Sequence, residues 1–600
     1  MTVLEDRVPE VASHTAASAL EAALGDPTAS ENPYGFAAMV RRAEQEAFPS
    51  ALTEIAGPAL RLAYIPADEG GDLVHYDQTL TLVRIAARRD LTIMPATMID
   101  ITATLCVLLA GDADQRERVV RLLRSGGSIG FAFSEPEHGS DLLANTCAMT
   151  PDRAAGGWRL NGEKWLVGFG RIAEAMLVIA HSGGRGPAAY SMVLVDNPLA
   201  LGSAGRRAAE ATGGTAKIRL QRPTGMRGTD FAHFEFDGVP VGDEAVVGRL
   251  GRGMETAMRA MQVVRATSTG ANLAAMDSAL RLTMDFAHEH NAAGRPVAQH
   301  PHNRRELGTA AAALIACDVV ATACARSIHT FPAAQSLWSG LVKTVLTDLS
   351  AEVFDRCADV LGTRSVLREG PEAAFDVLRA DNAVVRYFDT SPMANLRLVS
   401  VQLGRFTEDG FSAKQAGDRE LLATTFDVDA ALPPVDFADL ALSARGLEVV
   451  TGALPREMRA IFAAARPCTA QTLALLDRLD LAMHAVRTRI RGLTELSSAE
   501  RATTALDLAT EVGYLHAAAA CTQLWWFNRA RSLYGTTPGS LDWLLPALAL
   551  LLDRAEYRRT RLPMPLADSA FDVVARLRTQ QCLFAAQPVP LAPEKGMDQS

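Results

Sequence analysis

Two short stretches carry residue types that suit chemistry on a bound ligand. The first, GFAFSEPEHGSD, contains Ser134-Glu135-Pro136 and then Gly139-Ser140-Asp141. Glycine lets backbone N–H groups approach a ligand closely, and the two serine hydroxyls add hydrogen-bond donors of their own. This corner is therefore suited to holding a ligand against the main chain.

The second stretch, GGWRLNGEKWLVGFG, follows after a variable patch. Residues Trp158 to Lys164 are predicted to form a strand, an Asn-Gly hairpin turn and a returning strand. At this spacing the two stretches together resemble the acyl-CoA dehydrogenase family, in which T-E-P-x-A-G-S-D and N-G-x-K-x-W-I-T-N build the flavin-facing β-domain. The resemblance implies an oxidoreductase with FAD as its cofactor.

The elements that must position these stretches are mainly helical. Apolar periodicity predicts helices on both sides of a central region in which short apolar runs, separated by Gly, Asp and Pro turns, predict strands. By resemblance, the fold class is α+β, mostly α. It consists of an N-terminal helical domain (1–129), a middle β-barrel domain (130–248), a C-terminal four-helix bundle (249–418) and an extra helical domain (419–600).

The resemblance covers about residues 35–405. The remaining helical patterns carry no motif for chemistry, so packing or oligomerisation is their expected role. The tail from Gln587 is rich in proline and is expected to be disordered.

Length and composition restrict the class of protein. A chain of 600 residues is expected to form about two to four domains. The net charge of −10 is spread without a basic block, which argues against nucleic acid as a partner. Because the N-terminus lacks an apolar signal sequence and apolar runs such as Trp543 to Leu552 are too short to span a bilayer, we expect a cytoplasmic protein without a membrane span.

Dehydrogenation next to a thioester requires a base for the α-proton and an acceptor for a hydride from the β-carbon. No side chain accepts a hydride, so the chain must hold a flavin against the acyl group.

In the family the base is the glutamate of R-D-x-x-x-x-x-x-[YF]-E-G-T. Asp381 precedes Asp389 by eight residues, which is the family's spacing, so the resemblance places Asp389 at the base position. Alternatively, Asp389 is a helix N-cap.

The resemblance also implies six cofactor-binding positions: Phe133, Ser134, Gly139, Ser140, Val167 and Gly168. Ser134 corresponds to the threonine whose hydroxyl reaches the flavin ring, and Ser140 to the serine associated with the pyrophosphate. The aromatic residue of K-x-W-I-T is displaced by one place, to Trp165, and the ring-facing threonine is Gly168. Since side chains alternate along a strand, Trp165 is expected on the opposite face, where it either packs in the core or stacks on the flavin.

Three departures fall where the family binds the ADP half of FAD. The family's E-R-x-x-F-G, F-Q and G-G-x-G patterns are replaced by Glu289-His290-Asn291-Ala292-Ala293-Gly294, His300-Pro301 and Gly362-Thr363-Arg364-Ser365. Either Arg295, Arg304 or Arg364 supplies the missing charge from a new position, or FAD binds weakly or not at all. His300 and His302 lack a carboxylate or thiol at ligand spacing, so no metal site is predicted.

The first functional hypothesis is therefore the α,β-dehydrogenation of an acyl thioester, with either an acyl-CoA or an acyl-carrier-protein substrate. Two alternatives stay open: an FAD-poor, non-catalytic partner subunit or acyl-binding relative, and a flavin oxidase or monooxygenase on the same fold. The resemblance also implies a homodimer or homotetramer. The sequence leaves the electron acceptor undetermined.

Overall fold

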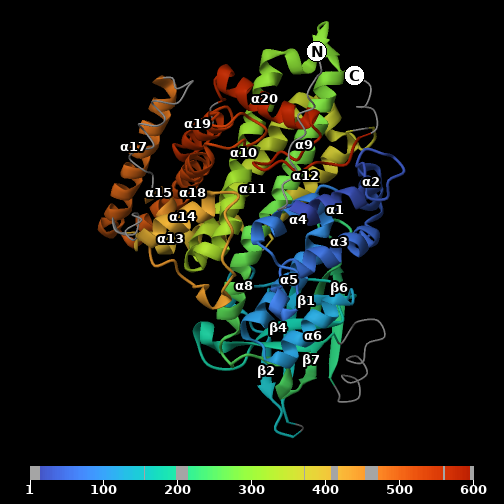
Figure 1. The fold of residues 1–600 in the computed structure, drawn as a ribbon. Coiled ribbons are helices and arrows are strands. Elements are labelled where there is room, and N and C mark those ends of the chain that lie inside the picture. Colours follow the sequence, from blue (N-terminus) through green and yellow to red (C-terminus); the bar gives the residue numbers. More distant parts are fainter. Residues whose placement is uncertain are drawn as a thin grey trace.

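The computed structural model describes residues 14–154, 156–197, 214–370, 372–388, 390–406, 416–452, 470–558 and 561–594. Figure 1 shows the strands of the main sheet gathered at one end of the molecule, below the N-terminal helices, whereas the short hairpin of β9 (Asn291–Ala292) and β10 (Arg295–Pro296) lies at the opposite end. Long helices extend from the main sheet toward that end, and the C-terminal helices lie along their side.

Six helices precede the sheet, and local sequence explains where several of them begin. Pro49 directly precedes α3, and Pro95 occupies the first turn of α5, where a missing N–H costs no helical hydrogen bond. Asp112 and Gln115 form a capping box at the start of α6. Their bounds are α1 (Thr15–Leu24), α2 (Phe36–Gln45), α3 (Ser50–Leu62), α4 (Tyr76–Ala87), α5 (Pro95–Ala110) and α6 (Ala113–Arg124).

Eight strands form one mixed sheet in the order β6-β7-β3-β2-β4-β5-β8, with β1 parallel to β4. Their bounds are β1 (Ile129–Ala132), β2 (Ala148–Pro151), β3 (Trp158–Gly168), β4 (Ala175–His181), β5 (Tyr190–Asp196), β6 (Thr215–Gln221), β7 (Phe231–Val241) and β8 (Val246–Val247). The apolar side chains between the strands form a compact cluster of their own, separate from the larger helical core.

The predicted Asn-Gly hairpin is wrong, because β3 runs without a turn from Trp158 to Gly168. Residues on both sides of this dipeptide pair with β7: Leu160 with Val239, and Gly162 with Phe236. The Oδ1 atom of Asn161 accepts a hydrogen bond from the Gly238 N–H (2.8 Å), which stabilises an irregularity in β7. A Cβ at Gly162 would lie 2.7 Å from the Cα of Cys147, so glycine serves close strand packing here.

Six helices follow the sheet and form the central bundle. They are α8 (Gly253–Thr267), α9 (Thr269–Glu289), α10 (Pro301–Thr330), α11 (Gln335–Leu361), α12 (Ala373–Val385) and α13 (Pro392–Leu403). Helix α11 packs against α8, α9, α10 and α13. The bundle thus connects the sheet to the C-terminal helices.

By length and composition, two stretches are apolar enough to cross a membrane: Leu91–Ala110 and Pro301–Thr330. Inside the protein, 82% and 94% of their most apolar windows are buried. A helix that is apolar on every side is expected at the centre of a large protein as well as in a bilayer. Both stretches are therefore core helices of this fold.

The C-terminal extension consists of helices that pack onto the bundle. They are α14 (Ala416–Phe426), α15 (Val449–Gly452), α17 (Ala470–Gly492), α18 (Ser498–Asn528), α19 (Leu544–Ala555) and α20 (Met564–Thr579). Helix α18 contacts α11 and α13, and α20 contacts α10. Ser497 and Glu500 form a capping box that begins α18.

The segment after α20 returns to the core, which contradicts the predicted disorder of the tail as far as residue 594. Phe584 N–H donates to the Asp277 carboxylate (3.0 Å), and Ala586 N–H donates to the Asp318 carboxylate (2.8 Å). Val589 is buried. Buried carboxylates of the bundle thus accept from the backbone just before Gln587. Within the tail, the Ala592 N–H donates to the buried Glu21 carboxylate (3.2 Å), so the Pro-rich segment is also held against the core.

Candidate functional site

A buried ion pair fixes the corner that follows β1. The Lys164 ammonium donates to the Glu135 carboxylate (3.0 Å) and to the Phe133 carbonyl (2.9 Å). Glu135 also accepts from the N–H groups of Thr146 (2.7 Å) and Cys147 (2.9 Å). Burial by itself raises the pKa of Glu135, but Lys164 and the two N–H donors outweigh it, and the pKa lies below its ordinary value. Glu135 is therefore a carboxylate that holds the corner in place.

Sequence reasoning did not identify this pair. Glu135 and Lys164 lie 29 residues apart, in two different motifs. The local signal in the sequence is limited to Lys164 itself, which lies on a strand between Glu163 and Trp165. If the side chains of these two neighbours point outward, Lys164 points inward, and a buried lysine requires a partner for its charge. Glu135 and Lys164 therefore fix the position of the corner after β1.

The corner presents an open glycine and two hydroxyl groups. Gly139 has φ +45°, and a Cβ there would meet no atom within 4 Å. Ser134 is half-buried and accepts a hydrogen bond from the Trp165 N–H through its carbonyl (2.8 Å). Ser140 is exposed. The donor set and the open backbone fit the flavin and pyrophosphate positions that the resemblance implies for these residues.

A β-bulge separates Lys164 from Val167 in the pairing of β3 with β7. Leu166 lies in the left-handed region, with φ +54°, so the strict alternation of side chains is interrupted beside Trp165. Val167 is buried in the cluster of the sheet. The bulge therefore includes Trp165, the aromatic residue that is displaced by one place relative to the family's pattern.

Gly168 packs directly beneath helix α5. A Cβ at Gly168 would lie 1.9 Å from the Cδ1 of Ile99, so Ile99 occupies the space that a side chain would need. Gly168 therefore offers only its backbone to a ligand. The threonine that the family carries at this position has no room here unless Ile99 moves.

The loop between α12 and α13 meets the corner and the end of the sheet. The Oγ atoms of Ser140 and Ser391 lie 3.4 Å apart. The ring of Phe388 lies 5.5 Å from that of Phe231, which pairs with Gly168. Ser391 also caps α13 by accepting from the Ala394 N–H (3.3 Å). Asp389, which the resemblance places at the base position, lies outside the described residues, between these two contacts in the chain.

Asp381 ties α12 to the loop before β7. Its carboxylate accepts from the Met226 N–H (2.5 Å), and a Cβ at the neighbouring Gly225 would lie 2.1 Å from the Ala380 carbonyl oxygen. Burial and the nearby Asp90 raise the pKa of Asp381 to about 7, against the opposing effects of the Met226 N–H and Arg227. The loop that carries position 389 therefore starts from an anchored helix.

The three arginines proposed to replace the family's ADP-binding charge are already engaged to different degrees. Arg304 forms ion pairs with Asp568 and Asp572 of α20, the second at 2.7 Å. Arg364 pairs with Glu372 (3.2 Å) and lies over the Phe286 ring. Arg295 lies 3.3 Å from a ring nitrogen of His300.

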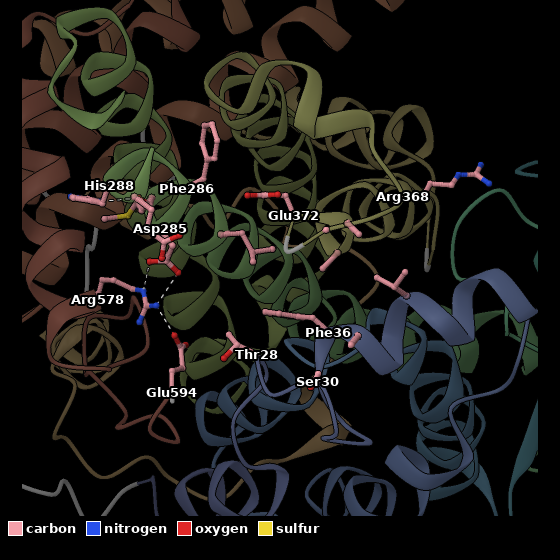
Figure 2. Close-up of a pocket in the computed structure, with 18 of the residues that line it drawn as sticks. Thr28, Ser30, Phe36, Asp285, Phe286, His288, Arg368, Glu372, Arg578 and Glu594 are labelled. Atoms are coloured by element: carbon pink, nitrogen blue, oxygen red, sulfur yellow. Dashed lines mark hydrogen bonds and ion pairs between the residues drawn. The ribbon is translucent and has the colours of Figure 1, made fainter. Parts of the chain in front are cut away.

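A pocket of about 880 Å³ opens beside these residues, between α2, α9, the start of α12, α20 and the tail (Figure 2). Arg578 extends into it and bonds both Asp285 (2.9 Å) and Glu594 (2.5 Å). Glu289 and Glu372 add further carboxylates to its lining, against one more arginine, Arg368. An excess of carboxylates opposes a pyrophosphate, so this pocket does not supply a replacement for the family's ADP-binding charge.

Two family models match the chain. The acyl-CoA dehydrogenase middle domain matches residues 130–239, and the acyl-CoA dehydrogenase C-terminal domain matches residues 251–386. A mitochondrial isovaleryl-CoA dehydrogenase of Solanum tuberosum is 27% identical over 194 residues, which cover 32% of this chain and 43% of that protein. The match thus spans less than half the length of that relative.

Solved structures extend the similarity. An acyl-CoA dehydrogenase from Bacillus anthracis, complexed with FAD, is 13% identical with a TM-score of 0.68 and covers 94% of each chain. A prolyl acyl carrier protein oxidase is 16% identical with a TM-score of 0.56, over 65% of this chain and 97% of its own. At these identities the likeness establishes the fold, which in the first case includes the C-terminal extension. Residues 130–239 and 251–386 therefore match the middle and C-terminal domains of the acyl-CoA dehydrogenase family, and the chain as a whole has the fold of a long acyl-CoA dehydrogenase with a helical C-terminal extension.

Proposed function

We propose that this protein is an FAD-dependent oxidoreductase that introduces an α,β double bond into an acyl thioester, carried either by CoA or by a carrier protein. The observation that carries the proposal is the position of the α12–α13 loop. Its described residues on either side of position 389 contact the cofactor corner through Ser391 and the end of the sheet through Phe388. A base on this loop would therefore lie next to the proposed cofactor.

In this proposal Asp389 takes the proton from the α-carbon. The hydrogen on the β-carbon leaves with its electron pair, so the acyl group loses two electrons and gains a C=C bond. A flavin, when bound, supplies the acceptor for this hydride. A desolvated carboxylate is a stronger base than an exposed one, because burial raises its pKa toward that of a neutral-pH catalyst.

The remaining residues of the corner bind and orient. Ser134, Ser140 and the open backbone at Gly139 would hold the flavin and its pyrophosphate, while Phe133, Val167 and Gly168 would form the wall beside it. Lys164 and Glu135 keep the corner in one conformation.

By resemblance to the family, we also propose that the protein is cytoplasmic and forms a homodimer or homotetramer. Light scattering of the purified protein would test the oligomeric state.

A second candidate is an FAD-poor, non-catalytic relative. It is supported by the ion pairs of Arg304 and Arg364 and by the carboxylates of the pocket in Figure 2, which leave the ADP half without an evident cationic partner in the described part of the chain. A third is an oxidase acting on a carrier-bound acyl group, which the similarity to the prolyl acyl carrier protein oxidase supports.

Three measurements separate these candidates. The visible spectrum after incubation with FAD and desalting shows whether the chain retains flavin. If it does, mass spectrometry of an acyl thioester incubated with the protein and an artificial electron acceptor should show a loss of two hydrogens. Oxygen consumption without that acceptor would favour the oxidase. No retained flavin would contradict the dehydrogenase proposal and favour the second candidate.

A further inference from the structure

A buried amide lies at the start of α13, close to the loop that carries the proposed base. This residue, Asn395, is 1% exposed. Its Nδ2 atom donates to the carbonyl of Thr390 (3.1 Å), and Thr390 directly follows position 389 in the chain. The hydrogen bond therefore reaches past the beginning of the helix, into the loop itself.

The helix cap does not hold this carbonyl. Ser391 caps α13, because its hydroxyl accepts from the Ala394 N–H (3.3 Å) and its carbonyl accepts from the Asn395 N–H (2.9 Å). Both bonds end at Ser391, since the N-cap residue provides the first carbonyl that an α-helix uses. The carbonyl of Thr390, one residue earlier, is held by the Asn395 side chain instead.

The other end of the Asn395 amide has no such bond. Its Oδ1 atom is buried and accepts no hydrogen bond from any described residue. A buried unpaired acceptor costs stability, whereas an apolar side chain of similar shape would not carry this cost. Packing therefore does not explain an amide at this position. What the amide contributes is the bond from Nδ2 to Thr390.

Asn395 is fixed on the central bundle. Helix α13 packs on α11, and Gly340 of α11 faces the turn from Asn395 to Val399. A Cβ at Gly340 would lie 3.3 Å from Cγ2 of Val399 and 3.9 Å from the Asn395 carbonyl oxygen, so glycine permits this close approach of the two helices. The amide of Asn395 thus joins the loop to a closely packed part of the bundle.

The contact of the loop with the cofactor corner is of a different kind. The hydroxyl groups of Ser140 and Ser391 are 3.4 Å apart and exposed to water. A hydrogen bond is stronger where water is excluded, so the bond made by the buried Asn395 restrains the loop more than the exposed serine contact does.

We infer that Asn395 is a positioning residue for the base of the proposed dehydrogenation. It holds the peptide between Thr390 and Ser391 against α13, so the base side chain starts from a fixed backbone. Without the Nδ2 donor this peptide is released, and a displacement of about 1 Å at a reacting group lowers a rate by about 100-fold. The catalytic part of this inference rests on the proposed function, whereas the restraint on the loop does not.

Hydrogen exchange of the full chain tests the restraint without any activity. The variant is Asn395→Leu, which keeps a side chain of similar size but lacks the donor. The matched control is Asn528→Leu, because Asn528 is also a buried amide, 2% exposed, and donates through Nδ2 to the Phe426 carbonyl at the end of α14 (2.7 Å). Exchange in α11 serves as the reference for intact folding.

Exchange in the peptide 386–394 should become about tenfold faster in Asn395→Leu and change less than about twofold in Asn528→Leu, while exchange in α11 stays as in the wild type. Unchanged exchange of this peptide in Asn395→Leu, or equal acceleration in both variants, would overturn the inference.

Stopped-flow bleaching of the flavin by octanoyl-CoA tests the catalytic part, in protein incubated with FAD and desalted. In Asn395→Leu the limiting rate should fall by about tenfold to 100-fold, while the retained flavin spectrum and the half-saturating concentration of octanoyl-CoA stay as in the wild type. Asn395→Gln restores an amide donor and should recover part of the lost rate. Asn528→Leu should bleach at the wild-type rate.

Two results would overturn the role of Asn395 in positioning the base. One is a loss of flavin or of octanoyl-CoA affinity at an unchanged limiting rate, and the other is an equal fall in rate in Asn528→Leu. Absence of bleaching in a wild type that retains flavin would contradict the proposed function instead, and the exchange experiment would still decide whether Asn395 holds the loop.

Discussion

The hydroxyl oxygens of Ser140 and Ser391 lie 3.4 Å apart, although 251 residues separate them in the chain. One belongs to the corner after β1 and the other caps α13. This contact joins the two halves of the proposed site: the part that holds the cofactor and the loop that carries the base position.

Lys164 is predicted to be essential for the cofactor corner. In Lys164→Met the Glu135 carboxylate stays buried without its cationic partner, which is expected to cost about 3–5 kcal/mol of unfolding free energy. The matched control is Lys217→Met, because Lys217 is exposed and lies 3.9 Å from Glu235; its effect should stay within about 0.5 kcal/mol. Chemical denaturation followed by circular dichroism measures both. Similar costs for the two variants would contradict the positioning role.

Gly168→Ala is predicted to overpack the contact with α5. The new Cβ would meet the Cδ1 of Ile99, at an expected cost of about 1–3 kcal/mol. Ile99→Val removes that carbon, so the double variant should be more stable than Gly168→Ala relative to its own Ile99→Val background. A double-mutant cycle from thermal unfolding measures this coupling. Additive effects of the two substitutions would show that Ile99 does not restrict position 168.

Asp381 is predicted to make stability depend on pH. Its pKa is raised from 3.8 to about 7 in the folded protein, so the folded state binds the proton more tightly than the unfolded state. The stabilisation is complete below about pH 4 and is lost as the pH rises through about 7. Asp381→Asn keeps an acceptor for the Met226 N–H without the charge, so its melting temperature should fall less than that of the wild type between pH 5.5 and 8.

The control for this experiment is Asp376→Asn on the same helix. Asp376 is partly exposed and pairs with Arg379 (2.9 Å), so this variant should follow the pH profile of the wild type. Parallel profiles for Asp381→Asn and the wild type would exclude Asp381 as the titrating group.

Asp277 is predicted to hold the C-terminal tail. Its buried carboxylate pairs with Arg281 (2.6 Å), Arg84 (3.3 Å) and Arg88 (3.2 Å) and accepts from the Phe584 N–H. Asp277→Asn should cost about 3–5 kcal/mol, because several buried arginines lose a counter-charge.

Hydrogen exchange locates the effect of Asp277→Asn. Exchange in the segment 582–592 should become faster in this variant. In Asp285→Asn, a control on the same helix that breaks the partly exposed pair with Arg578, exchange there should change little. Unchanged exchange in Asp277→Asn would contradict the proposed anchor.

Elements defined by local periodicity were predictable from the sequence. Apolar periodicity predicts helices over 76–89, 96–110 and 334–361, and α4, α5 and α11 begin and end within one or two residues of these bounds because long apolar stripes determine them. The turn at Asn161-Gly162 was not predictable in this way. Both sides of the dipeptide pair with β7, and only the partner strand reveals that β3 continues.

Features that depend on distant partners were also missed. The backbone that leads into the Pro-rich tail is held by Asp277 and Asp318, which lie about 270–310 residues before the groups that they accept from, and the tail itself is held by Glu21. The Glu135–Lys164 pair and the contact of Ile99 with Gly168 likewise join separate motifs. Of the candidate site, the sequence identified the corner and the base loop, but not the groups that hold them. The role of Asp389 itself stays a prediction.

The most direct test of the proposed function is an anaerobic titration of the FAD-incubated, desalted protein with an acyl thioester, followed by visible absorbance. The wild type and Asp376→Asn should retain flavin bands that bleach on addition of the thioester. Asp389→Asn should retain the same bands without bleaching, because the α-proton has no base. Bleaching at an undiminished rate in Asp389→Asn, or no retained flavin in the wild type, would contradict the proposed mechanism.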